Sequence, residues 1–250
     1  MKVIRRGKME KPKQLSDRYT QEILHEIQAG IYAHADRLPS EPDIAKRFGI
    51  SRTMVRDCLS ILEREGFISR KHGVGTIINQ HVLKVKVRID LEQEFLDMIR
   101  GAGYEADTAF VHVSHEAADE QVAKKLRINS GEGVVVSKRL ITADGKLAIH
   151  CSDYIAERSI AVRDYDLNLL KKPVFEFIKE YCDTEIYMDL SEVSAVAADA
   201  EMTENFGVEM GSPLLYIDEV GYNFVGQPIL YSKEHYADGI LKHTILRKKI

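Results

Sequence analysis

Two short helical segments joined by a glycine turn constrain this chain more than any other feature. Ser40 and Ser51 each precede a helical pattern, and Gly49 and Gly66 end those patterns. A serine before the first turn can cap free backbone N–H groups, and a glycine after the last turn accepts a left-handed conformation. Because one residue separates Gly49 from Ser51, the turn is tight. The sequence therefore predicts a helix-turn-helix over residues 40–66.

A preceding helix and a following hairpin extend this motif. Residues 15–30 carry one apolar stripe, and residues 67–78 place apolar residues on both sides of a glycine turn. Three helices followed by a hairpin are typical of a winged helix-turn-helix, here residues 15–79. The apolar stripes of the first and third helices consist of Tyr19, Ile23, Leu24 and Ile27, and of Val55, Cys58, Leu59 and Leu62.

The third helix carries polar residues away from its apolar stripe. Arg52 and Arg56 lie one turn apart at its start, with Thr53 further round. Arginine can bind guanine through two hydrogen bonds, and a hydroxyl can contact phosphate. The hairpin tip includes His72 and Gly73, which can reach an adjacent groove. A three-helix domain that contacts proteins, with solvated arginines, is the alternative interpretation.

The charge distribution agrees with a DNA-binding front. Residues 1–80 contain 15 Lys and Arg and 10 Asp and Glu, a net charge of +5, whereas residues 81–250 contain 20 and 29, a net charge of −9. Residues 1–14 are predicted to form a flexible basic arm. This separation is typical of a DNA-binding module joined to a different module, although a chance imbalance of surface charge is equally compatible with it.

The remainder of the chain predicts a mixed domain after a partly extended linker at residues 80–93. The overall fold class is α+β, with a winged helix-turn-helix followed by an α/β effector domain, residues 94–250, on a mainly antiparallel sheet. Two helix–strand–strand stretches, within residues 121–156 and 202–236, suggest an internal duplication. The predicted strands are 107–115, 133–142, 146–156, 186–198, 213–223 and 228–236, and the predicted helices are 92–100, 118–126, 174–182 and 200–206.

A longer motif runs through residues 37–76. It consists of Arg37-Leu38-Pro39-Ser40-Glu41, Ala45, Phe48-Gly49-Ile50-Ser51-Arg52-Thr53, Val55-Arg56, Leu59, Leu62-Glu63, Glu65-Gly66 and Gly73-Val74-Gly75-Thr76. This string resembles the N-terminal domain of GntR-type bacterial regulators. The chain departs from the family at Pro42, where an arginine is frequent, and at Met54, where a second threonine is common. We therefore predict these DNA-binding residues: Arg37, Ser40, Ser51, Arg52, Thr53, Arg56, His72 and Gly73.

The second domain carries a looser set of motifs, which are Ala143-Asp144-Gly145, Asp153-Tyr154, Gly211-Ser212-Pro213-Leu214-Leu215 and Gly226-Gln227-Pro228-Ile229-Leu230-Tyr231-Ser232. These resemble the effector domain of the HutC branch, the UTRA domain, which shares its fold with chorismate lyase. The resemblance implies a sheet platform with helices that dimerises and holds a small ligand in a cleft.

Comparison with sugar-phosphate-binding members of that branch implies the ligand positions. Arg139 matches one of their arginines, whereas Ile141, Cys151 and Leu230 replace an arginine and two glutamates. A phosphate needs several donors and sugar hydroxyls need acceptors, so we expect poor binding of amino-sugar phosphates. A purely structural role for the arginine and tyrosines is the alternative. The predicted ligand-binding residues are Arg139, Cys151, Tyr154, Leu230, Tyr231 and Tyr236.

The sequence therefore predicts a ligand-responsive repressor that binds a short inverted-repeat double-stranded DNA operator as a homodimer. An enzyme with a chorismate lyase-like domain and an architectural DNA-binding protein remain alternatives. We expect no catalytic residues, because no acid-base or nucleophile group stands out, and we expect no cofactor. No metal site is expected, because His112 and His115 would lie on opposite faces of a strand. Without an apolar run long enough to span a membrane or to follow a signal sequence, a cytoplasmic protein is expected. Three buried free thiols are predicted, Cys58, Cys151 and Cys182.

Overall fold

The helix-turn-helix and the sheet belong to separate parts of the chain. The computed structural model describes residues 12–162 and 164–249. Within that part of the chain, residues up to 91 form one compact unit together with 244–249, and residues 92–243 form the second. The chain therefore passes between the units twice, after residue 91 and again after residue 243.

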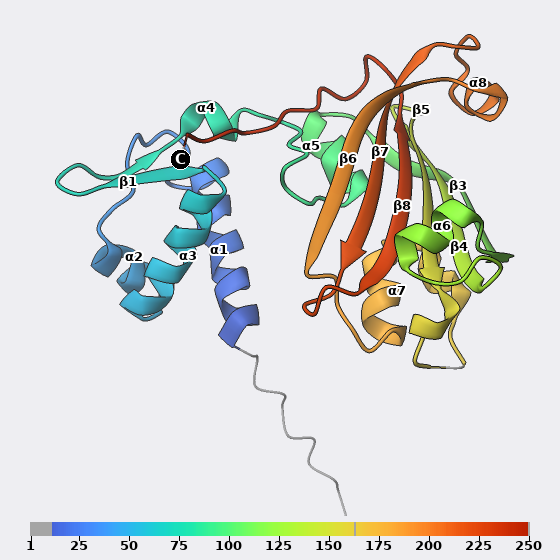
Figure 1. The fold of residues 1–250 in the computed structure, drawn as a ribbon. Helices are drawn as coiled ribbons and strands as arrows, with labels where there is room; N and C mark the ends of the chain where they lie inside the picture. Colours follow the sequence, from blue (N-terminus) through green and yellow to red (C-terminus); the bar gives the residue numbers. More distant parts are fainter. Residues whose placement is uncertain (1–11, 163, 250) are drawn as a thin grey trace, which may run out of the picture. The chain divides into compact units, whose positions relative to one another are not determined.

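The first unit begins with three helices and a hairpin (Figure 1), and the winged helix-turn-helix prediction is confirmed. Helices α1 (Pro12–Gln28), α2 (Glu41–Phe48) and α3 (Arg52–Arg64) precede strands β1 (Ile68–Lys71) and β2 (Gly75–Ile78), which pair antiparallel. Apolar residues spaced by three or four put one face of each helix into a common core. The core includes Ile23, Leu24, Ile27, Ile44, Val55, Cys58, Leu59, Leu62 and Ile68.

The helix starts differ from two expectations. Helix α1 begins at residue 12 rather than 15, so residues 12–14 of the predicted arm are helical; residues 1–11 lie outside the described residues. Ser51 caps α3 as predicted, because its hydroxyl accepts the N–H of the third following residue at 3.1 Å. Ser40 does not cap α2: its hydroxyl donates to the Asp43 carboxylate at 2.5 Å. The acidic side chain competes successfully for that hydroxyl.

The linker after the wing is hydrogen-bonded to the C-terminal part of the chain. Residues 80–83 of the linker, which was predicted to be partly extended, form a short helix, α4 (Gln80–Leu83). Further on, the Ile89 N–H donates to the Thr244 carbonyl, and the Thr244 N–H donates to the Val87 carbonyl, both at 3.1 Å. The last residues, which the sequence assigned to the effector domain at 94–250, therefore lie in the first unit.

A six-stranded antiparallel sheet forms the second unit, and its strand order is β3-β4-β5-β8-β7-β6. This observation confirms the predicted α+β class with a mainly antiparallel sheet. The strand bounds lie within about two residues of the predicted ones. The strands are β3 (Ala106–Ala117), β4 (Gly133–Ala143), β5 (Lys146–Ala156), β6 (Met188–Ala197), β7 (Pro213–Tyr222) and β8 (Pro228–Tyr236).

The internal duplication is visible in the topology. Each half of the sheet has a strand, a helix and a hairpin in the same order, and the halves meet where β5 pairs with β8. The helices that begin the hairpins, α6 (Glu120–Leu126) and α8 (Ala200–Phe206), are each capped by an aspartate, Asp119 and Asp199. The two halves therefore share the same arrangement, a helix capped by an aspartate and followed by a hairpin.

Helices cover the sheet on both faces. Helix α6 packs against one face, in a core that includes Val134, Val136 and Tyr231. Helix α7 (Val174–Tyr181) packs on the opposite face, on Val135 and Ile155. Neighbouring residues of a strand point to opposite faces, so this alternation decides which strand residues can share a cavity. The short helices η1 (Glu157–Ser159) and η2 (Leu167–Lys171) lie between β5 and α7.

Helix α5 (Phe95–Ala102) is shifted toward the C-terminus from the predicted helix at 92–100. Glu94 caps it by accepting the Leu96 N–H at 2.8 Å, and Gly103 ends it with a φ of 96°. Gly101, the predicted stop, lies inside the helix. The shift matters because it leaves residues 92–94 outside the helix.

Candidate DNA-binding surface and ligand cavity

The front of α3 presents the predicted polar surface. Arg52, Thr53 and Arg56 are exposed, whereas Val55 and Leu59 are buried in the core. The helical period produces this division, because residues three or four apart share a face. A guanidinium can contact a guanine edge and a hydroxyl can contact phosphate. The start of α3 therefore has the chemistry of a DNA-recognition helix.

Arg56 has an internal partner on α2. Its Nη2 lies 3.1 Å from Oε2 of Glu41, and 66% of the Arg56 side chain remains exposed. The hydrogen bond and charge of Glu41 raise the pKa of Arg56, so the guanidinium stays protonated. Exposed ion pairs contribute little to stability. Glu41 can therefore release Arg56 to a base or a phosphate.

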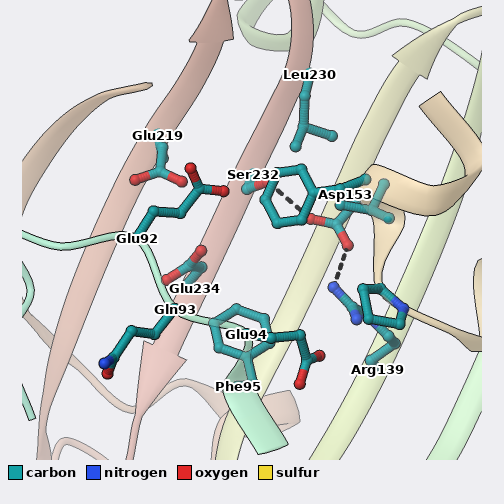
Figure 2. A pocket seen from close by; sticks show the side chains of 13 residues that line it. Glu92, Gln93, Glu94, Phe95, Arg139, Asp153, Glu219, Leu230, Ser232 and Glu234 are labelled. Atoms are coloured by element: carbon teal, nitrogen blue, oxygen red, sulfur yellow. Dashed lines mark hydrogen bonds and ion pairs between the residues drawn. The ribbon is translucent and has the colours of Figure 1, made fainter. Parts of the chain in front are cut away.

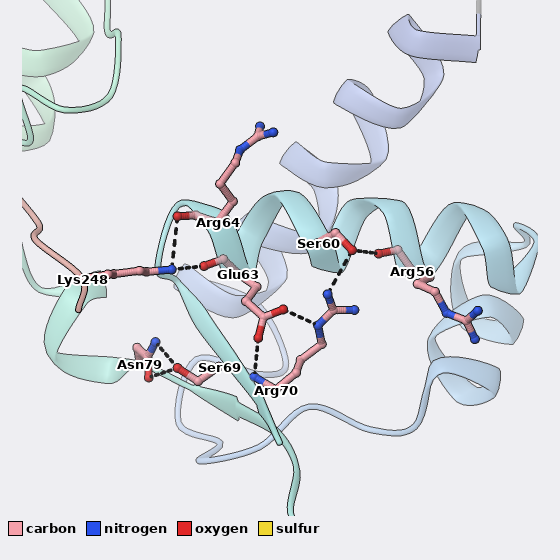
Figure 3. Close-up of polar contacts among 8 residues, drawn as sticks. All are labelled: Arg56, Ser60, Glu63, Arg64, Ser69, Arg70, Asn79 and Lys248. Carbon is pink, nitrogen blue, oxygen red and sulfur yellow. Dashed lines mark hydrogen bonds and ion pairs between the residues drawn. The ribbon is translucent and has the colours of Figure 1, made fainter. Parts of the chain in front are cut away.

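Arg70, on strand β1 of the wing, forms hydrogen bonds with α3 (Figure 3). The Arg70 Nε donates to Glu63 at 2.7 Å, its Nη2 donates to the Ser60 hydroxyl at 3.0 Å, and its backbone N–H donates to Glu63 at 2.8 Å. Burial alone would raise the pKa of Glu63, but the hydrogen bonds and charge of Arg70 outweigh burial and lower it. The wing is thereby held against the recognition helix.

The other predicted DNA-binding residues divide into two groups. His72 and Gly73 lie exposed at the wing tip, where a φ of 77° at Gly73 favours glycine. Arg37 instead donates from Nη1 to the Val74 carbonyl at 2.9 Å, which ties the loop before α2 to the wing. The polar groups of three predicted residues thus have partners within the fold: Arg37, Ser40 and Ser51.

The C-terminal segment completes the DNA-binding unit (Figure 3). The Lys248 Nζ donates to the backbone carbonyls of Glu63 and Arg64 at the end of α3. A cation at the end of a helix interacts favourably with the helix dipole. Leu246 packs on the same core, directly over Gly66, where a side chain on that glycine would collide with it. Sequence reasoning missed this role, because a contact across 180 residues has no local signal.

A cavity lies in the second unit, on the face covered by α5 and α7 (Figure 2). Its empty volume is about 410 Å³, part of which is open to solvent. Strands β4, β5, β7 and β8 supply one wall, and the segment before and into α5 supplies another. Its lining consists of Glu92, Gln93, Glu94, Phe95, Arg139, Asp153, Pro173, Val174, Phe175, Glu219, Leu230, Ser232 and Glu234.

Arg139 and Asp153 form a buried ion pair on one side of the cavity. Only 5% of Arg139 and 3% of Asp153 are exposed, and Nη2 lies 2.7 Å from the carboxylate. Ser232 donates to the other oxygen of Asp153 at 2.7 Å, and Cys151 donates to it at 3.3 Å. Burial opposes the charge of Arg139, but Asp153 outweighs burial and raises the Arg139 pKa. Breaking such a pair would leave a buried charge without its partner.

Three glutamates line the other side of the cavity, as Figure 2 shows. Glu234 is 7% exposed and accepts the Tyr236 hydroxyl at 2.5 Å, and Glu219 accepts the Ser191 hydroxyl. Burial, with the nearby charge of Glu219, raises the pKa of Glu234 to about 8. Burial also raises the pKa of Glu219 and that of Glu92. This side therefore carries a concentration of carboxyl groups that lack a cation in the structure.

The sheet separates the six predicted ligand-binding residues. Arg139 and Leu230 line the cavity, and Cys151 and Tyr236 lie just behind its lining, in contact with Asp153 and Glu234. Tyr154 and Tyr231 instead stack on each other at 5.7 Å, in the core under α6. They point to the opposite face, so the six residues do not share one cavity.

Sequence reasoning missed the glutamates, although a signal was present. Leu230 and Tyr236 were both assigned to the ligand side, and strand residues two apart share a face. That alternation places Ser232 and Glu234 between them, facing the same cavity. Glu219 joins them from β7, through a pairing with Ser232 that only the tertiary structure supplies.

A second hollow lies between α6, η1 and the segment before β6. It contains two arginines, but each donates to backbone: Arg158 to the Arg127 carbonyl at 2.8 Å and Arg127 to the Gly226 carbonyl at 3.3 Å. Both cations therefore have a structural role. The described residues contain no group of three or more His, Cys, Asp or Glu side chains arranged to hold a metal ion.

The fold and surfaces define a class, a winged-helix DNA-binding protein with a separate ligand-binding domain. Residues 15–78 match the family model described as bacterial regulatory proteins, gntR family, and residues 101–238 match the UTRA domain. The chain belongs to the gntR family of transcriptional regulators, in the group that carries a UTRA domain. Membership supports a regulator rather than the alternative of an enzyme.

One curated relative agrees with this assignment, and two solved structures share the fold. The HTH-type transcriptional regulator GgaR of Escherichia coli is 25% identical over 220 residues, which cover 87% of this chain and 85% of that protein. The crystal structure of the possible transcriptional regulator YydK from Bacillus subtilis has a TM-score of 0.73 at 21% identity and covers 93% of this chain and 99% of its own. The effector domain of PhnF from Mycobacterium smegmatis has a TM-score of 0.56 at 17% identity, covering 65% of this chain and all of its own. Among the described residues, no helix has the length and apolar character needed to cross a membrane.

Proposed function

We propose that this chain is a repressor that binds an inverted-repeat operator as a homodimer, and that a small molecule in the cavity changes its affinity for DNA. Residues 15–79 are the DNA-binding domain and the effector domain starts near residue 94. The protein acts where the chromosomal DNA is, in the cytoplasm. The cavity binds its ligand without transforming it.

One observation carries the proposal of ligand control. Both segments that connect the two units belong to the cavity or continue from it. Residues 92–95 line the cavity directly, and β8, which contributes Leu230, Ser232 and Glu234, leads through residues 237–243 into the segment that packs on α3. A ligand that shifts either wall therefore acts on a chain segment anchored in the DNA-binding unit. A ligand regulates only if it binds the two functional states with different affinities.

The edge of the sheet supports a homodimer. Strand β6 is an outer strand, and it exposes several large apolar side chains, namely Met188, Leu190 and Val193. A long exposed edge strand with apolar residues is normally covered. A second copy of this chain is the partner that matches an operator with two half-sites. Leu190→Glu should therefore shift the protein toward monomer in light scattering.

The proposed DNA contacts come from the exposed residues of α3 and the wing. Arg52, Thr53 and Arg56 enter the major groove, while His72 and Gly73 follow the adjacent backbone or minor groove. Arg37, Ser40 and Ser51 hold the loops that present this surface, and any contact of theirs is to phosphate.

Selection of DNA fragments from a random duplex library tests operator recognition. The selected sites should share a dyad, and their affinity should fall steeply with salt because phosphate contacts release counterions. Fluorescence anisotropy with the selected site then measures the effect of small molecules that stabilise the protein in thermal melts. Sites without a dyad would refute the dimer. Consumption of a stabilising compound would favour the enzyme, and a compound bound in the cavity without effect on DNA affinity would refute ligand control.

A further inference from the structure

The cavity has an unbalanced charge. Five carboxylates line it, and the single guanidinium among them is already paired. Asp153 is neutralised by that guanidinium, and Glu94 is engaged with the start of α5. The carboxyl groups left without a cation are Glu92, Glu219 and Glu234, which come from the connector, β7 and β8.

A buried polar atom of a residue that lines the same cavity lacks a partner. The Arg139 Nε is buried and has no hydrogen-bond partner among the described residues, although Nη2 of the same side chain is paired. A buried N–H without an acceptor is unfavourable and is rare in folded proteins. This observation is independent of the glutamates, and it indicates that a hydrogen-bond acceptor is supplied from outside the chain.

We propose that the cavity binds a small organic cation, with an ammonium group among Glu92, Glu219 and Glu234 and a hydrogen-bond acceptor at the Nε of Arg139. The inference rests on the proposed function, because it takes the cavity to be the effector site. One side of the cavity lacks a cation and the other lacks a hydrogen-bond acceptor. One compact molecule with an amine and a hydroxyl, carbonyl or carboxylate group supplies both.

A cation fits this cavity better than the alternatives. A phosphate needs several free donors, but the one guanidinium in the lining is paired and three glutamates would repel a dianion. A neutral polyol can use the carboxyl groups as acceptors but supplies no positive charge to the cavity. The side chains do not form a metal-binding group within the described residues. An ammonium donates three hydrogen bonds and carries the missing charge.

Cation binding should also release protons. Burial raises the pKa of Glu234 to about 8, so this carboxyl group holds its proton near neutral pH when the cavity is empty. Burial also raises the pKa of Glu219 and that of Glu92. An ammonium favours their ionised form and lowers these pKa values, so affinity should rise with pH up to about 8. The titratable and charged groups around Glu234 from every packed element are Glu92, Glu94, Arg139, Cys151, Asp153, Asp189, Glu219 and Tyr236.

Matched probes test the charge of the ligand on the full chain. Putrescine is compared with 1,4-butanediol and glucosamine with glucose, by thermal melts and by calorimetry in two buffers of different protonation enthalpy. The amine of at least one pair should stabilise the protein and release protons, and its neutral partner should not. Glucosamine 6-phosphate should bind more weakly than glucosamine. Equal binding of amine and alcohol, or no binding of either amine, would overturn the inference.

Substitutions locate the binding site. Glu234→Gln keeps the shape of the side chain and should weaken amine binding by about tenfold or more, with loss of the proton release. Glu219→Gln provides a second variant with the same expectation. Glu204→Gln, an exposed position on α8, is the matched control and should bind as wild type. Amine affinity unchanged in both cavity variants would place the cation elsewhere and refute the proposal.

The outcomes separate this inference from the proposed function. If a neutral or anionic compound binds in the cavity and changes operator affinity, ligand control stands and the cationic ligand is refuted. If an amine binds through Glu234 but operator affinity is unchanged, the cationic ligand stands and ligand control is refuted.

Discussion

Replacing Glu234 by glutamine should stabilise this protein at alkaline pH. The carboxyl group is almost fully buried in the cavity, and burial with the charge of Glu219 raises its pKa from 4.5 to about 8. The folded state therefore binds this proton more tightly than the unfolded state. Stability from this group is fully present below about pH 4.5 and is lost as the pH rises through about 8.

The size of the effect follows from the pKa difference. One pKa unit corresponds to about 1.4 kcal/mol, so ionised Glu234 destabilises the folded state by at most about 5 kcal/mol above pH 8. Glutamine cannot ionise, and its amide oxygen can still accept the Tyr236 hydroxyl. The Glu234→Gln variant should therefore match wild type near pH 5 and exceed it by up to about 5 kcal/mol near pH 9.

Urea unfolding across this pH range, followed by circular dichroism, measures the difference. Glu204→Gln serves as the control, because this exposed glutamate lies on α8 and does not line the cavity. A Glu234→Gln variant whose advantage is independent of pH, or which is less stable than wild type near pH 9, would refute the argument. The expected gain in stability together with loss of amine binding is typical of a residue retained for function.

Three further predictions concern the DNA-binding unit. Arg52→Ala and Arg56→Ala should each weaken binding to the selected operator by ~1–3 kcal/mol in anisotropy titrations, and wild-type affinity in both would exclude the α3 surface. Ser51→Ala should lower the free energy of unfolding by ~1 kcal/mol through loss of the cap. Ser40→Ala should change it much less because that hydroxyl caps nothing; equal losses would contradict the different capping roles. Removal of residues 244–250 should lower the melting temperature and weaken operator binding, since Leu246 and Lys248 stabilise α3; unchanged values for both would contradict the role of the C-terminal segment.

Local sequence signals were sufficient wherever structure depends on neighbours in the chain. Apolar residues spaced by three or four predicted α1 and α3, because this period directly expresses helix geometry, and the six strands were also predicted within about two residues. The cap at Ser51 followed from the same local chemistry. The expected cap at Ser40 does not form, because the Ser40 hydroxyl donates to the Asp43 carboxylate instead.

The candidate site was predicted only in part. Exposure of Arg52 and Arg56 could be derived from one helix, so this part of the candidate DNA-binding surface needed no tertiary information. The ligand-binding residues could be located only with the sheet in hand. Tyr154 and Tyr231 lie on the face opposite Arg139, because neighbouring residues of a strand point to opposite faces. A family resemblance identifies positions along the chain but does not determine which face of a strand they occupy.

The sequence by itself determined the winged helix and the strands of the second unit, because helices, strands and hairpins depend on residues close together in the chain. The separation of a basic front from an acidic remainder is likewise a property of the sequence alone. Only the tertiary structure decided that Glu92, Glu219 and Glu234 meet in one cavity and that the last residues pack on α3. Both arrangements join segments more than 100 residues apart. Their pairing depends on strand order and on the packing of distant segments, which no local pattern encodes.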